Sequence, residues 1–136
     1  MPPPLHESTL RIYYEDTDAG GIVYHANYLR YFERVRTDWL RSLGAVHTEL
    51  AQREDLMFVV RDMTLDFRAP ARLDDLISVD VRVTRARRAS LQLMQIARHA
   101  ASGATLVVAE LRVAAIQRSG GKPLGLPSWL FEKVRG

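Results

Sequence analysis

Residues 24–43 carry the longest helical pattern of the chain, and this pattern restricts the possible folds more than any other feature. Apolar side chains recur every three or four residues, at Tyr24, Tyr28, Phe32, Val35, Trp39 and Leu43. Leu29 and Leu40 widen this stripe, and charged residues fill the opposite face. Gly44 then offers a helix end, because glycine readily takes the left-handed conformation. We expect one long amphipathic helix that needs a sheet to cover it.

The rest of the chain alternates between apolar and polar residues, as strands do. We predict a helix start between Ile22 and Asn27, short helices at 46–53 and 128–134, and strands at 9–14, 57–68, 77–85, 90–100 and 105–118. Within the strands, Leu10, Ile12 and Tyr14 share one face, and Met63, Leu65 and Phe67 are expected to point inward. Short links favour antiparallel pairing. The prediction is therefore an α+β fold, one domain over residues 1–136, with a five-stranded sheet curled around the helix.

Two local features complete this prediction. The alternation slips near Leu93–Met94, which favours a bulge there. Residues 1–8 contain three consecutive prolines and no periodicity, so we expect a loose end.

Composition excludes several functional classes. The chain has 136 residues, 47% hydrophobic and 26% charged, and it contains no cysteine, which rules out disulfides and thiol catalysis. It has no 18-residue apolar stretch, and its start lacks the apolar core of a signal peptide, so we expect a cytoplasmic protein without a membrane span. The net charge of +3 comes almost entirely from arginines interleaved with acids. Nucleic acid is one interpretation, but a small phosphorylated ligand fits at least as well.

An acidic, glycine-containing turn precedes the helix and holds Asp16, Asp18, Gly20, Gly21 and His25. An ordinary turn would use the same residues for local hydrogen bonds and positive φ. A calcium loop does not fit, because Gly20 and Asn27 stand where ligands belong and no helix precedes it. A catalytic interpretation has a physical basis: the N–H groups of a helix start polarise a carbonyl, and a nearby carboxylate activates water or attacks that carbonyl itself.

Other chemistry is weakly supported. The four histidines show no metal-binding spacing, and His25 alone is more often a packing or capping residue than a catalyst. Motifs for a serine nucleophile or a nucleotide loop are absent, so no metal or cofactor is expected. Tyr14 and Tyr24 lie near enough to the turn to line a pocket. Arg87 and Arg88, shortly before Ser90, form either a solvated turn or a phosphate site.

At residues 13–44 the chain reads YYEDTDAGGIVYHANYLRYFERVRTDWLRSLG. This stretch resembles the signature of the YbgC-type acyl-CoA thioesterases, in the 4-hydroxybenzoyl-CoA thioesterase family. The matching positions are Tyr14, Asp18, Gly20, Gly21, His25, Asn27, Tyr28 and the FER at Phe32 to Arg34. The resemblance extends over essentially the whole chain but is specific only here; Arg87, Arg88 and Ser90 match more weakly.

This resemblance implies the hot-dog fold and hydrolysis of an acyl-CoA thioester. Asp18 would be the nucleophile or general base, a backbone N–H near His25 would polarise the carbonyl, and the side chains of His25 and Tyr14 would position substrate or water. The residues implied in substrate binding are Gly20, Gly21, Tyr24, Asn27 and Tyr28, with Arg87, Arg88 and Ser90 for the CoA phosphates and the acyl group running near Tyr28 and Phe32. The family also implies homodimers or homotetramers with active sites at subunit interfaces, and no nucleic-acid partner.

Two other functions stay open at this point. One is a dehydratase or related enzyme acting on acyl-carrier-protein thioesters. The position of Asp18 before the helix argues against it. The other is a non-catalytic binding or interaction module, against which the intact Asp18 weighs. The acyl chain itself is not encoded in any motif.

Overall fold

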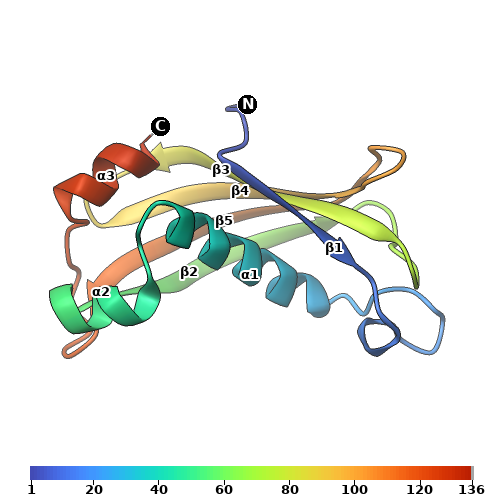
Figure 1. The fold of residues 1–136 in the computed structure, drawn as a ribbon, viewed down its shortest axis with the longest axis horizontal. Helices are drawn as coiled ribbons and strands as arrows, with labels where there is room; N and C mark the ends of the chain where they lie inside the picture. The colour runs from blue at the N-terminus through green and yellow to red at the C-terminus, as the bar shows by residue number, and fades with distance from the viewer. Residues whose placement is uncertain (136) are drawn as a thin grey trace.

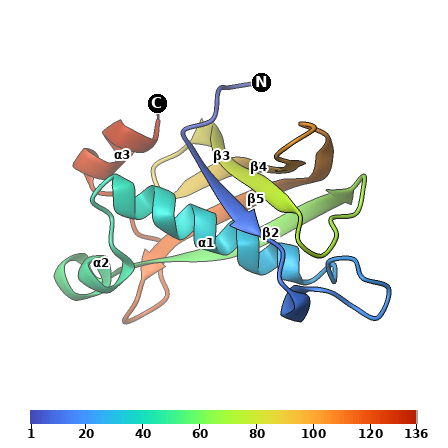
Figure 2. The same ribbon diagram turned by 45° about the vertical axis from the view of Figure 1, so that its right-hand side comes forward.

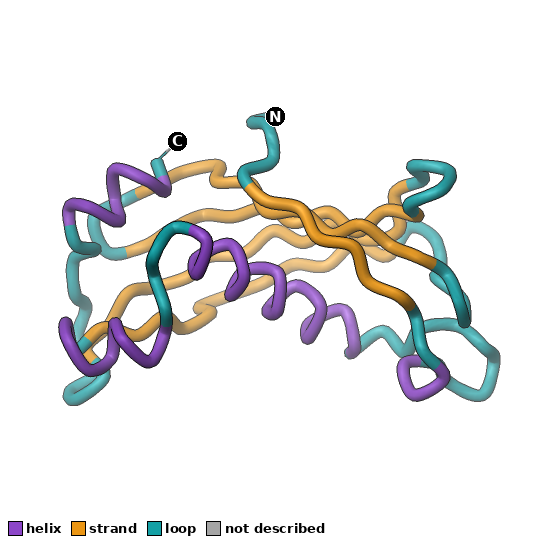
Figure 3. Tube along the Cα trace, in the orientation of Figure 1, coloured by secondary structure: helices purple, strands orange, loops and turns teal. Residues whose placement is uncertain are grey.

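A computed structural model describes residues 1–135 and shows one long helix lying along a curved sheet (Figures 1 and 3). The elements in chain order are β1 (His6–Arg11), the 3₁₀ turn η1 (Tyr14–Asp16), α1 (Asn27–Ser42), α2 (His47–Glu54), β2 (Leu56–Phe67), β3 (Leu76–Ala86), β4 (Ser90–His99), β5 (Thr105–Gln117) and α3 (Ser128–Val134). The helices and strands predicted from the sequence are all present.

The five strands form one sheet in the order β1-β3-β4-β5-β2, and every neighbouring pair is antiparallel. The sheet curves around α1, which lies on its concave side, while α2 and α3 lie near the C-terminal end of α1 (Figure 2). This arrangement confirms the predicted α+β hot-dog architecture. Both β1 and β2 are edge strands, because each pairs with only one neighbour.

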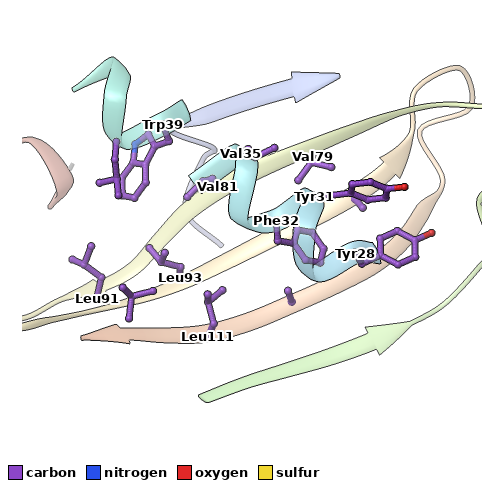
Figure 4. Packing of buried hydrophobic residues seen from close by; sticks show 14 of the residues in the cluster. Tyr28, Tyr31, Phe32, Val35, Trp39, Val79, Val81, Leu91, Leu93 and Leu111 are labelled. Carbon is purple, nitrogen blue, oxygen red and sulfur yellow. The ribbon is translucent and has the colours of Figure 1, made fainter. Parts of the chain in front are cut away.

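The predicted helical stripe forms the core. The side chains of Tyr28, Phe32, Val35 and Trp39 are buried and face the inner side of the sheet, where Figure 4 shows Val79, Val81, Leu91, Leu93 and Leu111 opposite them. Gly44 ends α1 as predicted: its φ is +90°, and its N–H donates to Arg41 O at 2.9 Å. The N–H of Ala45 donates to Leu40 O at 2.9 Å, which completes a Schellman motif.

Several boundary predictions are wrong. Residues 6–8 are not loose, because they pair with β3 as part of β1. The strand ends at Arg11, so Tyr14 does not share its face but lies in η1 and is 82% exposed. The helix begins at Asn27, within the predicted range, but Tyr24, the first member of the predicted stripe, lies outside it and is 49% exposed.

Leu29 and Phe67 are also not covered as predicted; they are 44% and 48% exposed. Phe67 lies on the edge strand β2, where a single chain provides no further strand, and Leu29 lies in the first turn of α1. Their exposure therefore marks an uncovered side of the molecule rather than an error in the periodicity.

The predicted bulge at Leu93–Met94 is also wrong, because β4 keeps its alternation there. The apparent slip comes from Gln95, a polar residue on the inner face that is 0% exposed. The irregularities lie next to Val60, Val83 and Ala97, and the one next to Val83 puts its extra residue on β3, opposite Leu93. Gln95 is satisfied inside the core, since its Nε2 donates to Phe32 O at 3.1 Å.

Candidate active site

The acidic turn forms a small hairpin that projects between β1 and α1 (Figure 1). Thr17 and Val23 pair across it, and the N–H of Asp18 donates to Ile22 O at 2.9 Å. Gly21, at φ +77°, closes the turn with an N–H donated to Asp18 O at 3.0 Å. A positive φ of this kind is the reason that the turn needs glycine at this position.

The Asp18 carboxylate is exposed and has a fixed orientation. Its Oδ1 accepts the N–H of Gly20 at 2.8 Å, and a Cβ added to Gly20 would lie 3.2 Å from that same oxygen. Among residues 1–135, Oδ2 has no hydrogen-bond partner. One carboxylate oxygen is thus anchored by the turn while the other faces solvent.

Asp16 is a residue whose role the sequence did not separate from that of the turn. Its Oδ2 accepts the N–H of Tyr13 at 2.8 Å, which stabilises η1. Its carbonyl oxygen accepts both Asn27 Nδ2 at 2.8 Å and the N–H of Tyr24 at 3.0 Å. Asp16 and Asn27 therefore tie the acidic turn to the first residue of α1, and the spacing of these two residues was the only signal available in the sequence.

The start of α1 is tightly wound. The N–H groups of Asn27, Tyr28 and Leu29 each donate to the carbonyl three residues earlier, at 2.9, 3.3 and 3.2 Å. The N–H groups of His25 and Ala26, by contrast, have no acceptor within residues 1–135. They are free donors at the positive end of a 16-residue helix, where negative charge is favoured.

Aromatic rings join the helix start to the end of β2. The exposed His25 ring lies 4.6 Å from that of Tyr24 and 6.2 Å from that of Phe67. Phe67 also contacts Tyr28, with 5.9 Å between ring centres. The Tyr14 ring is exposed and contacts none of these rings within residues 1–135, so a single chain does not bring it into this cluster.

Two tyrosine hydroxyls are buried beneath the same region. Tyr28 and Tyr31 pack edge to face at 5.7 Å, their hydroxyls point the same way in Figure 4, and neither hydroxyl has a hydrogen-bond partner within residues 1–135. Burial raises the pKa of both phenols, and the carboxylate of Asp16 raises that of Tyr31 further. Both phenols are therefore neutral at physiological pH. Tyr28, 3% exposed, connects this buried pair to the aromatic cluster through Phe67.

The arginine segment lies at the other end of the sheet. Asp18 belongs to a hairpin that pairs with residues just before β3, whereas Arg87, Arg88 and Ser90 follow the end of β3. The 11 residues of β3 separate these ends by roughly 33 Å at about 3.3 Å per step. The C-terminal segment packs there, since Leu126 donates its N–H to Arg88 O at 2.8 Å. One chain alone does not bring the arginines to Asp18.

The described residues contain no group of three or more histidine or acidic side chains placed to hold a metal ion. Across residues 1–135, no helix is long and apolar enough to cross a membrane.

Comparison with known proteins identifies the family of the chain. The family model described as the thioesterase-like superfamily matches residues 13–134. The chain belongs to this superfamily. The chain is 40% identical to "Acyl-CoA thioesterase YbgC" of Haemophilus influenzae over 118 residues, which cover 87% of this chain and 85% of the relative. It is 42% identical to "Acyl-CoA thioester hydrolase YbgC" of Escherichia coli O6:H1 over 130 residues, 93% and 92% of the two chains.

Solved structures show the same fold. A probable thioesterase from Bartonella henselae is 39% identical to this chain. Its structure superposes with a TM-score of 0.83, covering 90% of this chain and 98% of the other. The 1,4-dihydroxy-2-naphthoyl-CoA thioesterase Slr0204 from Synechocystis superposes with a TM-score of 0.88 over 96% and 95% of the two chains. At 22% identity, the second likeness concerns the fold alone.

Proposed function

We propose that this protein hydrolyses the thioester bond of an acyl-CoA, giving the free acid and CoA. The observation that carries the proposal is the Asp18 carboxylate, fixed by the turn immediately before a helix start whose His25 and Ala26 N–H groups are free. The relatives named as acyl-CoA thioesterases, at 40% and 42% identity over most of the chain, support the same activity.

The reaction needs a site for the thioester carbonyl and a group that delivers oxygen to it. The free N–H groups of His25 and Ala26 would donate to the carbonyl oxygen and stabilise the negative charge that develops there. Asp18 would act by one of two routes: its carboxylate removes a proton from a water that attacks the carbonyl carbon, or it attacks that carbon itself and water then cleaves the anhydride. In both routes the C–S bond breaks and the CoA thiolate leaves and takes up a proton.

The remaining residues position substrate in this proposal. Gly20 and Gly21 let the thioester approach the backbone, because they carry no side chain. The rings of His25, Tyr24 and Tyr14 border the approach, and Asn27 holds the helix start through Asp16. Tyr28 forms the floor on which the acyl group would begin.

We also propose that two copies pair side by side through β2. This edge strand is 12 residues long, and its apolar Met57, Val60 and Phe67 are 37%, 45% and 48% exposed. Long exposed apolar edges favour pairing with another chain. A two-fold axis makes the two β2 strands antiparallel, so opposite ends of the two sheets lie side by side. The end of one sheet that carries Arg87, Arg88 and Ser90 would then lie next to the end of the other sheet that carries Asp18. The CoA phosphates would bind to this arginine segment. A second pairing of such dimers would give a tetramer.

The test is release of free CoA from short, long and aromatic acyl-CoAs, with wild type and Asp18→Asn compared side by side. Asp38→Asn is the matched control, because Asp38 is exposed on α1 and outside the site. We expect one substrate class to be cleaved rapidly by wild type and by the control, with a loss of at least about a hundredfold in Asp18→Asn. Equal, slow release by all three proteins would favour a non-catalytic binding module instead.

A further inference from the structure

A cavity of about 400 Å³ lies between α1 and the half of the sheet formed by β4, β5 and β2. It occupies the end of the molecule opposite Asp18, since it is bounded by the first residues of β2 and β4. Its walls are mainly apolar, with Leu40, Phe58, Val60, Leu91, Leu93 and Val113. Its polar lining consists of Glu33, Arg36, Thr37 and His47.

Arg36 is the unusual member of this lining, because it is a buried cation. The residue is 9% exposed, and its Nη1 donates to Oε1 of the fully buried Gln95 at 2.9 Å. A guanidinium carries five N–H donors. Among the described residues this is the one hydrogen bond it makes, and it forms no ion pair with a carboxylate. The charge is thus held by a neutral partner, in a residue that lines the cavity.

The surroundings of the cavity are more positive than negative. Burial lowers the pKa of Arg36, and Glu33 opposes this effect. Burial also lowers the pKa of His47, and Arg41 and Arg36 lower it further, against Glu33 alone. An unpaired buried charge is costly, and a carboxylate is the partner that matches a guanidinium in both charge and geometry. The cavity is therefore suited to an apolar group that ends in a carboxylate.

We propose that this cavity holds the far end of an acyl chain that terminates in a carboxylate, so that the substrates are CoA monothioesters of dicarboxylic acids and Arg36 determines that specificity. The inference rests on the proposed thioesterase function and on pairing through β2. Pairing places the cavity, at residues 57–60, beside the end of the partner's β2, where Phe67 contacts His25. The acyl group would enter from the partner's thioester site. The bond broken is the same thioester, and the distal carboxylate takes no part in the reaction.

The first test compares plain acyl-CoAs with their ω-carboxy counterparts of equal length, from about four to eight carbons, by kcat/KM. A charge-assisted hydrogen bond predicts at least about a tenfold preference of wild type for the ω-carboxy member. Arg36→Met should lose that preference while cleaving plain acyl-CoAs within about twofold of wild type. Arg41→Met is the matched control, because Arg41 is exposed on the same helix and does not line the cavity; it should keep the preference.

The second readout is the pKa of His47, followed by NMR while wild type is titrated with the free dicarboxylic acid. A bound carboxylate favours the protonated imidazole, so the pKa should rise in wild type and stay unchanged in Arg36→Met. A wild type that cleaves both members of each pair equally fast overturns the inference and leaves the thioesterase function intact. If no thioester is cleaved, the proposed function fails, and an absent His47 shift overturns the cavity assignment as well. If Arg36→Met does not fold, wild type alone still provides both measurements, the preference for the ω-carboxy substrate and the shift in the pKa of His47.

Discussion

Pairing of two copies makes a quantitative prediction about mixed dimers. Asp18 and the Arg87–Arg88 pair lie at opposite ends of one chain, so a shared site takes Asp18 from one copy and the arginines from the other. An Asp18→Asn variant and an Arg87→Ala/Arg88→Ala variant should each be poorly active alone. When they are mixed, each heterodimer contains one site with both parts intact and one site with both parts altered.

The expected recovery follows from this counting. Random exchange of equal amounts makes about half of the dimers mixed, and half of the sites in those dimers are intact, so about a quarter of all sites recover. The two variants are first mixed under conditions that allow subunits to exchange. The assay then measures CoA release at a low acyl-CoA concentration, where the loss of phosphate contacts lowers the rate.

The control uses the same double arginine variant mixed with Asp38→Asn, which should behave as a mixture of active and inactive chains. The shared site would be refuted if mass analysis shows that heterodimers have formed but the activity of the Asp18→Asn mixture stays equal to the sum of the two variants' separate activities. It would place all catalytic parts in one chain.

Three further predictions follow from individual contacts. Val60→Lys should weaken the dimer about thirtyfold or more, since burying its half-exposed side chain contributes about 1 kcal/mol in each copy; concentration-dependent sedimentation measures this, and an unchanged mass would exclude the β2 interface. Gly44→Ala should lower the free energy of unfolding by about 1 kcal/mol or more, because its φ is +90°, whereas Gly120→Ala lacks this strain; urea denaturation compares the two. The lowered pKa of His47 means that this side chain binds a proton more readily in the unfolded chain than in the folded one. The free energy of unfolding should therefore fall as pH drops through and below about 6.5. In urea unfolding curves measured over a pH series, His47→Asn should flatten this part of the pH dependence.

The uncovered side of the molecule explains why some sequence predictions were wrong. Leu29 and Phe67 follow the periodicities of a helix and a strand correctly, yet both are about half exposed. Periodicity shows which face of an element is apolar, but the element that covers that face is determined elsewhere in the chain or in a second copy. Exposure of Phe67, on the edge strand β2, is thus consistent with the proposed pairing.

The candidate site was predictable in part. Asp18, Gly20, Gly21 and His25 are neighbours in the chain, so the sequence alone predicts that they cluster before the helix. The structure adds the hydrogen bond that orients Asp18 and the free N–H groups of His25 and Ala26 at the helix start. The role of Asp16 was not predictable, because its carbonyl and carboxylate act on Tyr13, Tyr24 and Asn27 through local backbone geometry.

The elements and their order follow from local patterns in the sequence. A stripe of apolar residues at helical spacing ended by Gly44 requires a helix, and the alternating segments require strands, since both patterns arise from local backbone geometry. The folded chain alone shows that Arg36 and Gln95 meet inside the core, 59 positions apart in sequence, and that Arg87 and Arg88 lie far from Asp18. Such facts depend on how the sheet curves around α1, and long-range packing of this kind leaves no periodic pattern in the chain.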